Sequence, residues 1–144
     1  MKKIIYFVIF SFSLFSNAQE AEAKKVVATF FEGFHSRDTL KIKSVCHEKM
    51  LLQSIAESKK GTKFSEESAK EFIQSFAKFP KELQFEERLL DYKIEIDGAV
   101  AHVWTPYEFY VNGSFSHSGV NSFTLFFENN QWKIVHLIDT RRKK

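Results

Sequence analysis

The 144-residue chain carries 21 Lys and Arg against 18 Asp and Glu, and 44% of its residues are hydrophobic. Such a composition excludes an intrinsically disordered chain, and the length suits one domain with a core of its own. The formal charge of +3 is too small to indicate a nucleic-acid-binding protein, and a single cysteine excludes an internal disulfide.

The first 18 residues are organised like a signal peptide. Lys2 and Lys3 precede an apolar run over residues 4–15, and small residues follow as far as Ala18. The run is too short to cross a bilayer. We therefore expect cleavage after Ala18 and export to the periplasm or the exterior. Residues 19–144 would then form a single domain with no membrane partner and a nearly balanced charge. The basic C-terminal end, residues 141–144, is interpreted as a solvated terminus.

Helical spacing of apolar residues dominates the first half of the mature chain. Phe30, Phe31 and Phe34 belong to a first predicted helix that ends near Gly33 to Ser36. Asp38 is expected to cap a short second helix, and residues 50–52 form a brief strand or a turn. Ser65 is expected to cap a third helix, which ends before Pro80.

From residue 85 to residue 140 the apolar spacing is close to two, which indicates a meander of strands. Helices followed by strands predict an α+β domain, with three N-terminal helices packed on one face of a strongly curved antiparallel sheet. The turns that join the strands are expected at residues 96–98, as a three-residue loop with a bulge at Gly98, and at two-residue loops at Asn112-Gly113 and Asn129-Asn130.

The Asn112-Gly113 turn predicts which residues share a face of the sheet, because directly opposed residues lie on the same side. It places Glu108 opposite His117 and Trp104 opposite Asn121. We assign to the core face the bulkier of the two resulting sets: Val100, His102, Trp104, Glu108, Tyr110, Phe115, His117, Asn121, Phe123, Leu125 and Phe127. The turn at Asn129-Asn130 adds Trp132, Ile134, His136, Ile138, Thr140 and Arg142 to this face. A bulge near Pro106 or Gly119 would reverse the faces beyond it.

Mixed aromatic and polar side chains at one end of this face predict a small-molecule cavity. The candidate ligand-binding residues are Trp104, Tyr110, His117, Asn121 and Arg142. An indole beside an amide can stack on and hydrogen-bond a flat heterocycle, although a tryptophan next to helices is often a plain core residue.

Glu108 and His117 form either an acid-base dyad or a structural ion pair. His102 and His136 are expected deeper in the core. No metal-ligand spacing, phosphate loop or nucleophile motif is present, so no metal or cofactor is predicted.

The opposite face is too apolar for open solvent and predicts a homodimer formed through the outer side of the sheet. Its apolar residues are Val103, Tyr107, Phe109, Val120, Phe126, Val135 and Leu137. Asp139 and Arg141 fall on this face as well and suit a salt bridge or a subunit contact.

The order of elements, with Phe30-Phe31-Glu32-Gly33-Phe34, residues 103–110, 115–121 and 132–141, resembles the nuclear-transport-factor-2-like superfamily, which includes ketosteroid isomerase, scytalone dehydratase and the SnoaL-type cyclases. The chain is most similar to an exported bacterial branch labelled lumazine-binding. The resemblance implies a cone-shaped fold in which enzymes place acids and bases. In that comparison Asp38 lies near a catalytic aspartate of isomerases, or is simply the cap of the second helix.

These patterns favour an exported domain that binds a small, flat or heterocyclic molecule without transforming it. The first alternative is a cofactor-independent isomerase or dehydratase that uses Glu108 and His117. The second alternative is a protein-interaction module that acts through its outer sheet face.

Overall fold

The computed structural model describes the backbone of residues 2–80 and 82–143, and side chains from Asn17 onward apart from those of residues 77, 81 and 144. The side chains of residues 1–16, most of the predicted signal peptide, lie outside the described residues. The helices are α1 (Lys2–Ser36), α2 (Thr39–Val45) and α3 (Ala69–Ser75), and α3 continues into a 3-10 turn, η1 (Phe76–Lys78). None of the described helices combines the length and hydrophobicity needed to cross a membrane.

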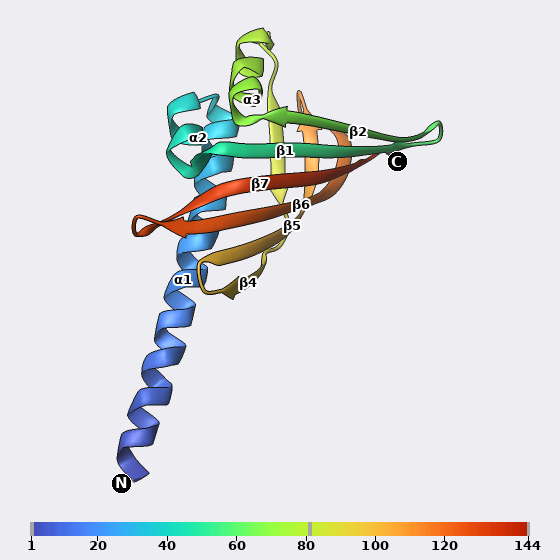
Figure 1. Ribbon diagram of the computed structural model, residues 1–144. Coiled ribbons are helices and arrows are strands. Elements are labelled where there is room, and N and C mark those ends of the chain that lie inside the picture. The colour runs from blue at the N-terminus through green and yellow to red at the C-terminus, as the bar shows by residue number, and fades with distance from the viewer. Residues whose placement is uncertain (1, 81, 144) are drawn as a thin grey trace.

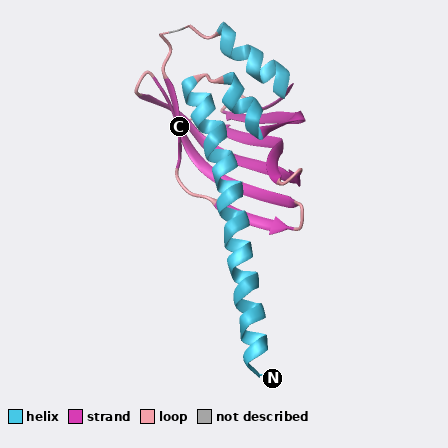
Figure 2. Cartoon of the chain, turned by 90° about the vertical axis from the view of Figure 1, so that its left-hand side faces the viewer, coloured by secondary structure: helices cyan, strands magenta, loops and turns pink. Residues whose placement is uncertain are grey.

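Seven strands form one sheet in the order β2-β1-β7-β6-β5-β3, and β4 pairs with the other end of β5. The strands are β1 (Cys46–Ser58), β2 (Gly61–Ser68), β3 (Phe85–Leu89), β4 (Lys93–Asp97), β5 (Val100–Val111), β6 (Ser114–Glu128) and β7 (Gln131–Arg142). The helices lie on one side of this curved sheet (Figures 1 and 2). The predicted α+β cone is thus confirmed. The sheet is mixed rather than wholly antiparallel, because β1 runs parallel to β7.

The starts of the two short helices follow from their capping residues. The Asp38 side chain accepts hydrogen bonds from the backbone N–H groups of Leu40 and Lys41, so the predicted cap of α2 is confirmed. The predicted cap of α3 is wrong, because Ser68 rather than Ser65 begins the helix in a capping box with Glu71. Ser65 instead belongs to β2, where it pairs with Ser54 of β1.

The Asn112-Gly113 turn forms as predicted, with positive φ at both residues. Tyr110 faces Phe115 across it, but Phe109 faces His117, so Ser116 is an extra residue in β6. Such a bulge shifts the pairing by one and moves every later residue of the partner strand to the other face. The bulge therefore reverses β5 relative to the prediction, and it lies at neither of the positions expected for it.

A second bulge has the same effect on β7. The Asn129-Asn130 turn forms as predicted, and Leu125 pairs with Ile134. Thr124 then pairs with His136, which leaves Val135 as the extra residue. Beyond it, odd-numbered residues of β7 face the helices, where the prediction placed even-numbered ones.

The loop between β4 and β5 also differs from the prediction. Asp97 pairs directly with Val100, so the connection is the two-residue loop Gly98-Ala99 rather than residues 96–98. Gly98 does have a positive φ. The residues of β4 that face the core are Ile94 and Ile96, which pack against the buried cluster.

The core lies between the helices and the concave side of the sheet. Val27 and Phe30 of α1 and Ile42 of α2 pack there with Val103 of β5 and Phe123 of β6. The outer side of the sheet exposes other residues of the same strands, with Trp104 at 43% and Val100 at 49% exposure. The alternation along β5 therefore places its odd-numbered residues inside.

Candidate functional site

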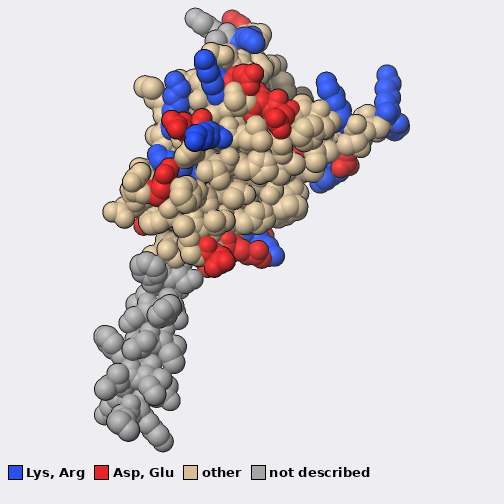
Figure 3. All heavy atoms as spheres, viewed as in Figure 1, with Lys and Arg blue, Asp and Glu red and all other residues tan. Residues whose placement is uncertain are grey.

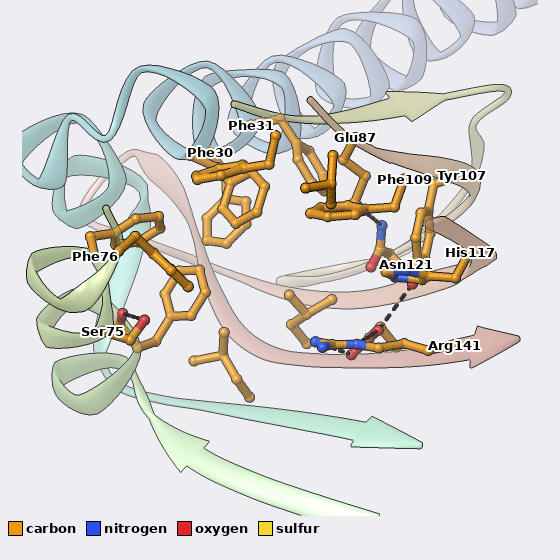
Figure 4. Close-up of a pocket in the computed structure, with 18 of the residues that line it drawn as sticks. Phe30, Phe31, Ser75, Phe76, Glu87, Tyr107, Phe109, His117, Asn121 and Arg141 are labelled. Carbon is orange, nitrogen blue, oxygen red and sulfur yellow. Dashed lines mark hydrogen bonds and ion pairs between the residues drawn. The ribbon is translucent and has the colours of Figure 1, made fainter. Parts of the chain in front are cut away.

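A cavity of about 380 Å³ lies between α1, α3 and the concave side of the sheet. One wall is made of phenylalanine rings from helices and strands: Phe30, Phe31, Phe34, Phe72, Phe76, Phe79 and Phe85, with Phe109 where this wall meets the polar groups. The opposite wall carries polar groups: Glu67, Glu87, Tyr107, His117, Asn121, Asp139 and Arg141. Figure 4 shows Phe30, Phe31 and Phe76 on one side of the cavity and Tyr107, His117, Asn121 and Arg141 gathered on the other.

Glu87 and Asn121 form the central hydrogen bond of the polar wall. The Asn121 amide Nδ2 donates to Oε1 of Glu87 at 2.6 Å, and Asn121 is buried. The backbone N–H of Glu87 donates to Nε2 of His35 on α1, which anchors β3 at this point. Burial raises the pKa of the Glu87 carboxyl to about 7, with a further increase from Asp139 and opposing effects of the Asn121 hydrogen bond and Arg141. Glu87 can therefore gain or lose a proton near neutral pH.

Tyr107 connects β5 to β7 across β6. Its hydroxyl oxygen lies 2.8 Å from the carbonyl oxygen of Thr140 and 3.1 Å from Oδ2 of Asp139, so both acceptors share the one hydroxyl proton. Asp139 in turn accepts from Nε of Arg141 at 2.8 Å. Burial and the Asp139 carboxylate raise the pKa of Tyr107, which keeps the phenol neutral.

His117 lies at the rim of the polar wall between two rings. Its imidazole stacks on Phe109 with ring centroids 4.8 Å apart, and it meets Tyr107 edge to face. Burial lowers the pKa of His117, and Arg141 lowers it further. The imidazole is therefore uncharged at neutral pH and can accept or donate one hydrogen bond.

Glu67 contributes a third carboxyl from β2. Partial burial raises the pKa of Glu67, against the effect of Arg141. Glu67 and Arg141 also border a second, more open cavity of about 310 Å³ between β1, β2 and the end of β7.

Two of the predicted site residues, His117 and Asn121, line the cavity, and four do not. Trp104, Glu108 and Tyr110 lie on the outer side of β5, because the Ser116 bulge reverses that strand. Tyr110 there donates to Glu108 at 2.8 Å, and the Arg88 guanidinium lies over its ring. Arg142 lies outside because the Val135 bulge reverses β7.

The predicted Glu108–His117 dyad is therefore wrong. Glu108 pairs with Ser118, whose side chain shares its outer face, while His117 points inward. His102 is on the outer face too, within hydrogen-bond distance of the Ser122 hydroxyl rather than in the core. His136 is partly buried, with Nε2 3.0 Å from Oε1 of Gln53.

Asp139 and Arg141 form the salt bridge expected of them, but on the inner face rather than the outer. Tyr107, Phe109, Val103 and Leu137, which supported the predicted dimer surface, also lie inside. For Glu87 a signal existed in the sequence. It stands between Phe85 and Leu89 in a strand of period two, so an acid occupies a position that alternation gives to the core.

No three His, Cys, Asp or Glu side chains are grouped closely enough to hold a metal ion within the part of the chain that the structure describes. The polar side chains that line the cavity carry carboxyl, phenol, imidazole, amide and guanidinium groups.

No family model matches the sequence, and no curated protein matches it either. Solved structures match across most of the chain. A nuclear-transport-factor-2-like protein from Salmonella enterica has a TM-score of 0.68 at 16% identity, covering 90% of this chain and 94% of its own. The β subunit of a proposed aromatic-ring-hydroxylating dioxygenase from Novosphingobium aromaticivorans has a TM-score of 0.72 at 8% identity, covering 90% and 92%.

A proposed dehydratase of the same family from Streptomyces avermitilis has a TM-score of 0.65 at 12% identity, covering 90% and 99%. Identities this low establish the fold alone. The chain therefore has the nuclear-transport-factor-2-like fold that its order of elements resembles.

Proposed function

We propose that this chain, which has the nuclear-transport-factor-2-like fold, binds a small, flat molecule with an apolar ring face and a polar edge. The observation that supports the proposal is the division of the 380 Å³ cavity into a phenylalanine wall and a polar wall. This volume lies toward the lower end of small-molecule sites, roughly 300–1,000 Å³. Aromatic walls give contact area, and a few polar groups then fix orientation.

The polar wall suits a ligand that both accepts and donates hydrogen bonds. Asn121 donates to Glu87 with only one of its amide hydrogens, and its carbonyl oxygen is a further acceptor. His117 offers one more neutral nitrogen at the rim. A flat heterocycle has the required combination of ring face and polar edge. Lumazine is one example, and the branch that the sequence resembles is labelled lumazine-binding.

A plug variant tests whether ligands enter this cavity. Ser75 lines the cavity from the end of α3, whereas its neighbour Gln74 is exposed. A panel of flat heterocycles, lumazine included, is screened by thermal shift and calorimetry against wild type, Ser75→Trp and Gln74→Trp. We expect the tryptophan at position 75 to abolish binding and the one at position 74 to leave it intact. If both variants bind the ligand equally well, the ligand does not bind in this cavity.

A second candidate function is proton transfer by Glu87, as in a cofactor-independent isomerase or dehydratase. The specific observation is a carboxyl with a pKa of about 7 facing an aromatic cavity, because a general base works best near the operating pH. The Streptomyces avermitilis neighbour supports this candidate only through its fold. Glu87→Gln should abolish turnover of any substrate found and weaken binding of that substrate by about tenfold at most.

We also propose that the chain is exported after cleavage behind Ala18. Among the described residues, the first in the buried cluster is Ala23, so the predicted cleavage removes none of the described core. Expression with the full N-terminus, followed by N-terminal sequencing of the exported fraction, should yield Gln19 as the first residue. An uncleaved product confined to the cytoplasm would contradict export.

We propose the outer face of the sheet as a homodimer surface. Because the bulges reverse β5 and β7, this surface consists partly of other residues than the sequence predicted. It exposes Val100, Trp104 and Phe126 to the extent of 38–49%. Figure 3 shows that charged side chains gather at the margins of this view, while its centre is uncharged. Light scattering should give a dimer that Trp104→Glu dissociates. A wild-type monomer would contradict the homodimer.

A further inference from the structure

We propose that the ligand of this cavity carries a positive charge, an ammonium or amidinium group on a flat aromatic body, and that Glu87 is its counter-ion. The inference rests on the proposed function, because it names the chemical class of molecule that the same cavity would bind.

The first argument is the balance of charged groups in the cavity wall. Three carboxyl groups line it, those of Glu67, Glu87 and Asp139, against one guanidinium, that of Arg141. Arg141 directs two nitrogens at Asp139, at 2.8 and 3.4 Å. Among the described residues, Glu67 and Glu87 have no ion pair. The wall therefore holds more acid than its own cation neutralises.

The second argument is the surroundings of Glu87. Its only side-chain hydrogen bond within the described chain comes from the neutral Asn121 amide. The groups around it are His35 on α1, Tyr107 on β5, and Asp139 and Arg141 on β7. A carboxylate without a cation in such a site is destabilised by desolvation, and a bound ammonium group would remove that cost.

The third argument is the composition of the apolar wall. The face of a phenylalanine ring attracts a cation through the quadrupole of the ring. Such rings can therefore stabilise a cationic ligand without a second carboxylate besides that of Glu87. Phe85, on the same strand as Glu87, and Phe109, opposite Glu87 on β5, stack with centroids 6.4 Å apart, and both line the cavity. A cationic head beside Glu87 and an apolar body along the other rings would match both walls at once.

Three probes of one shape test the charge of the ligand: 2-naphthylmethylamine, 2-naphthylmethanol and 2-naphthoate, measured by calorimetry at pH 8. The amine should bind at least about tenfold tighter than the alcohol, because hydrogen bonds between charged groups are about twice as strong as neutral ones. The carboxylate should bind more weakly than either. Equal affinities, or a preference for the carboxylate, would overturn the inference and leave the proposed function standing. Failure of all three probes to bind would instead count against the proposed function itself.

Variants assign the charge preference to one carboxyl. Glu87→Gln keeps the acceptor for Asn121 and should reduce amine affinity about tenfold with little effect on the alcohol. The matched control is Glu86→Gln, since Glu86 is exposed and pairs with Arg88 on the other side of the strand. If Glu87→Gln and Glu86→Gln bind the amine alike, Glu87 is not the counter-ion.

The pH dependence gives an independent readout. The ionised fraction of a group with a pKa of about 7 rises from roughly a tenth at pH 6 to nine tenths at pH 8. Amine affinity should therefore rise up to about tenfold over this range in wild type and much less in Glu87→Gln, while any contribution of His35, His117 and Glu67 is common to both proteins. The same slope in both proteins would reject Glu87.

Discussion

The hydroxyl oxygen of Tyr107 lies 2.8 Å from the carbonyl oxygen of Thr140, two strands away. Gly119 of β6, which pairs with Tyr107, lies between them. A Cβ atom built on Gly119 would lie 1.7 Å from that carbonyl oxygen and 2.8 Å from the Tyr107 hydroxyl. The missing side chain lets the carbonyl approach, so this glycine is required for a close contact rather than for an unusual φ.

Gly119→Ala should therefore destabilise the protein by about 3 kcal/mol, as overpacking of a well-packed interior costs 1–3 kcal/mol and backbone must move here. Urea unfolding followed by circular dichroism measures the change in midpoint at constant m-value. Ser118→Ala is the matched neighbour and should cost far less. A Gly119→Ala protein as stable as wild type would show that β7 shifts freely at Thr140.

Glu87→Gln should change how stability depends on pH. The pKa of Glu87 is about 7 in the folded protein against an ordinary value near 4.5, so the folded state keeps its proton where the unfolded state has lost it. Folding stability then falls as pH rises from about 4.5 to about 7, and stays level above. Removing the group should raise stability at pH 8, relative to pH 4.5, by at most about 2–3 kcal/mol.

Urea midpoints for wild type and Glu87→Gln at several pH values measure this effect. Glu86→Gln serves as the control, because the Arg88 hydrogen bond lowers the pKa of Glu86 instead, and its removal should not stabilise the protein at pH 8. Parallel pH profiles for wild type and Glu87→Gln would mean that Glu87 is solvated and titrates normally.

Asp38→Ala should cost about 1 kcal/mol of stability, because it removes the acceptor for two N–H groups at the start of α2. Asp38→Asn, which keeps the acceptor oxygen, should recover most of the loss. Chemical denaturation of both variants tests this. Asp38 lies outside the cavity lining, so ligand affinity should be equal in both variants, and a selective loss of binding would favour the catalytic interpretation.

The two tryptophans should differ in access to solvent. Trp104 is 43% exposed and Trp132 is 3% exposed. At a dilution at which the proposed dimer has dissociated, acrylamide should quench the emission of Trp132→Phe, which retains Trp104, several times more strongly than that of Trp104→Phe. Equal quenching would contradict the assignment of faces in β5, or would show that a partner covers Trp104.

Local signals account for what the sequence predicted well. Asn112-Gly113 and Asn129-Asn130 adopt positive φ at little steric cost, and Asp38 supplies an oxygen to a helix start, so each feature depends on its immediate neighbours. Asn121 and His117 were identified because β6 keeps the expected alternation from residue 117 to residue 127. Trp104, Glu108, Tyr110 and Arg142 were misassigned because alternation propagates a single-residue error along a whole strand.

The sequence by itself determined the fold class, the turns at Asn112-Gly113 and Asn129-Asn130 and the cap of α2, because capping and turn geometry act over a few residues. Only the tertiary structure decided where Ser116 and Val135 bulge. Neither residue has a local signature that alternation could detect. The register that these bulges set brings Glu87, Asn121 and Asp139 from three strands to one cavity, because pairing between strands, and not the alternation of one strand, decides which face each side chain takes.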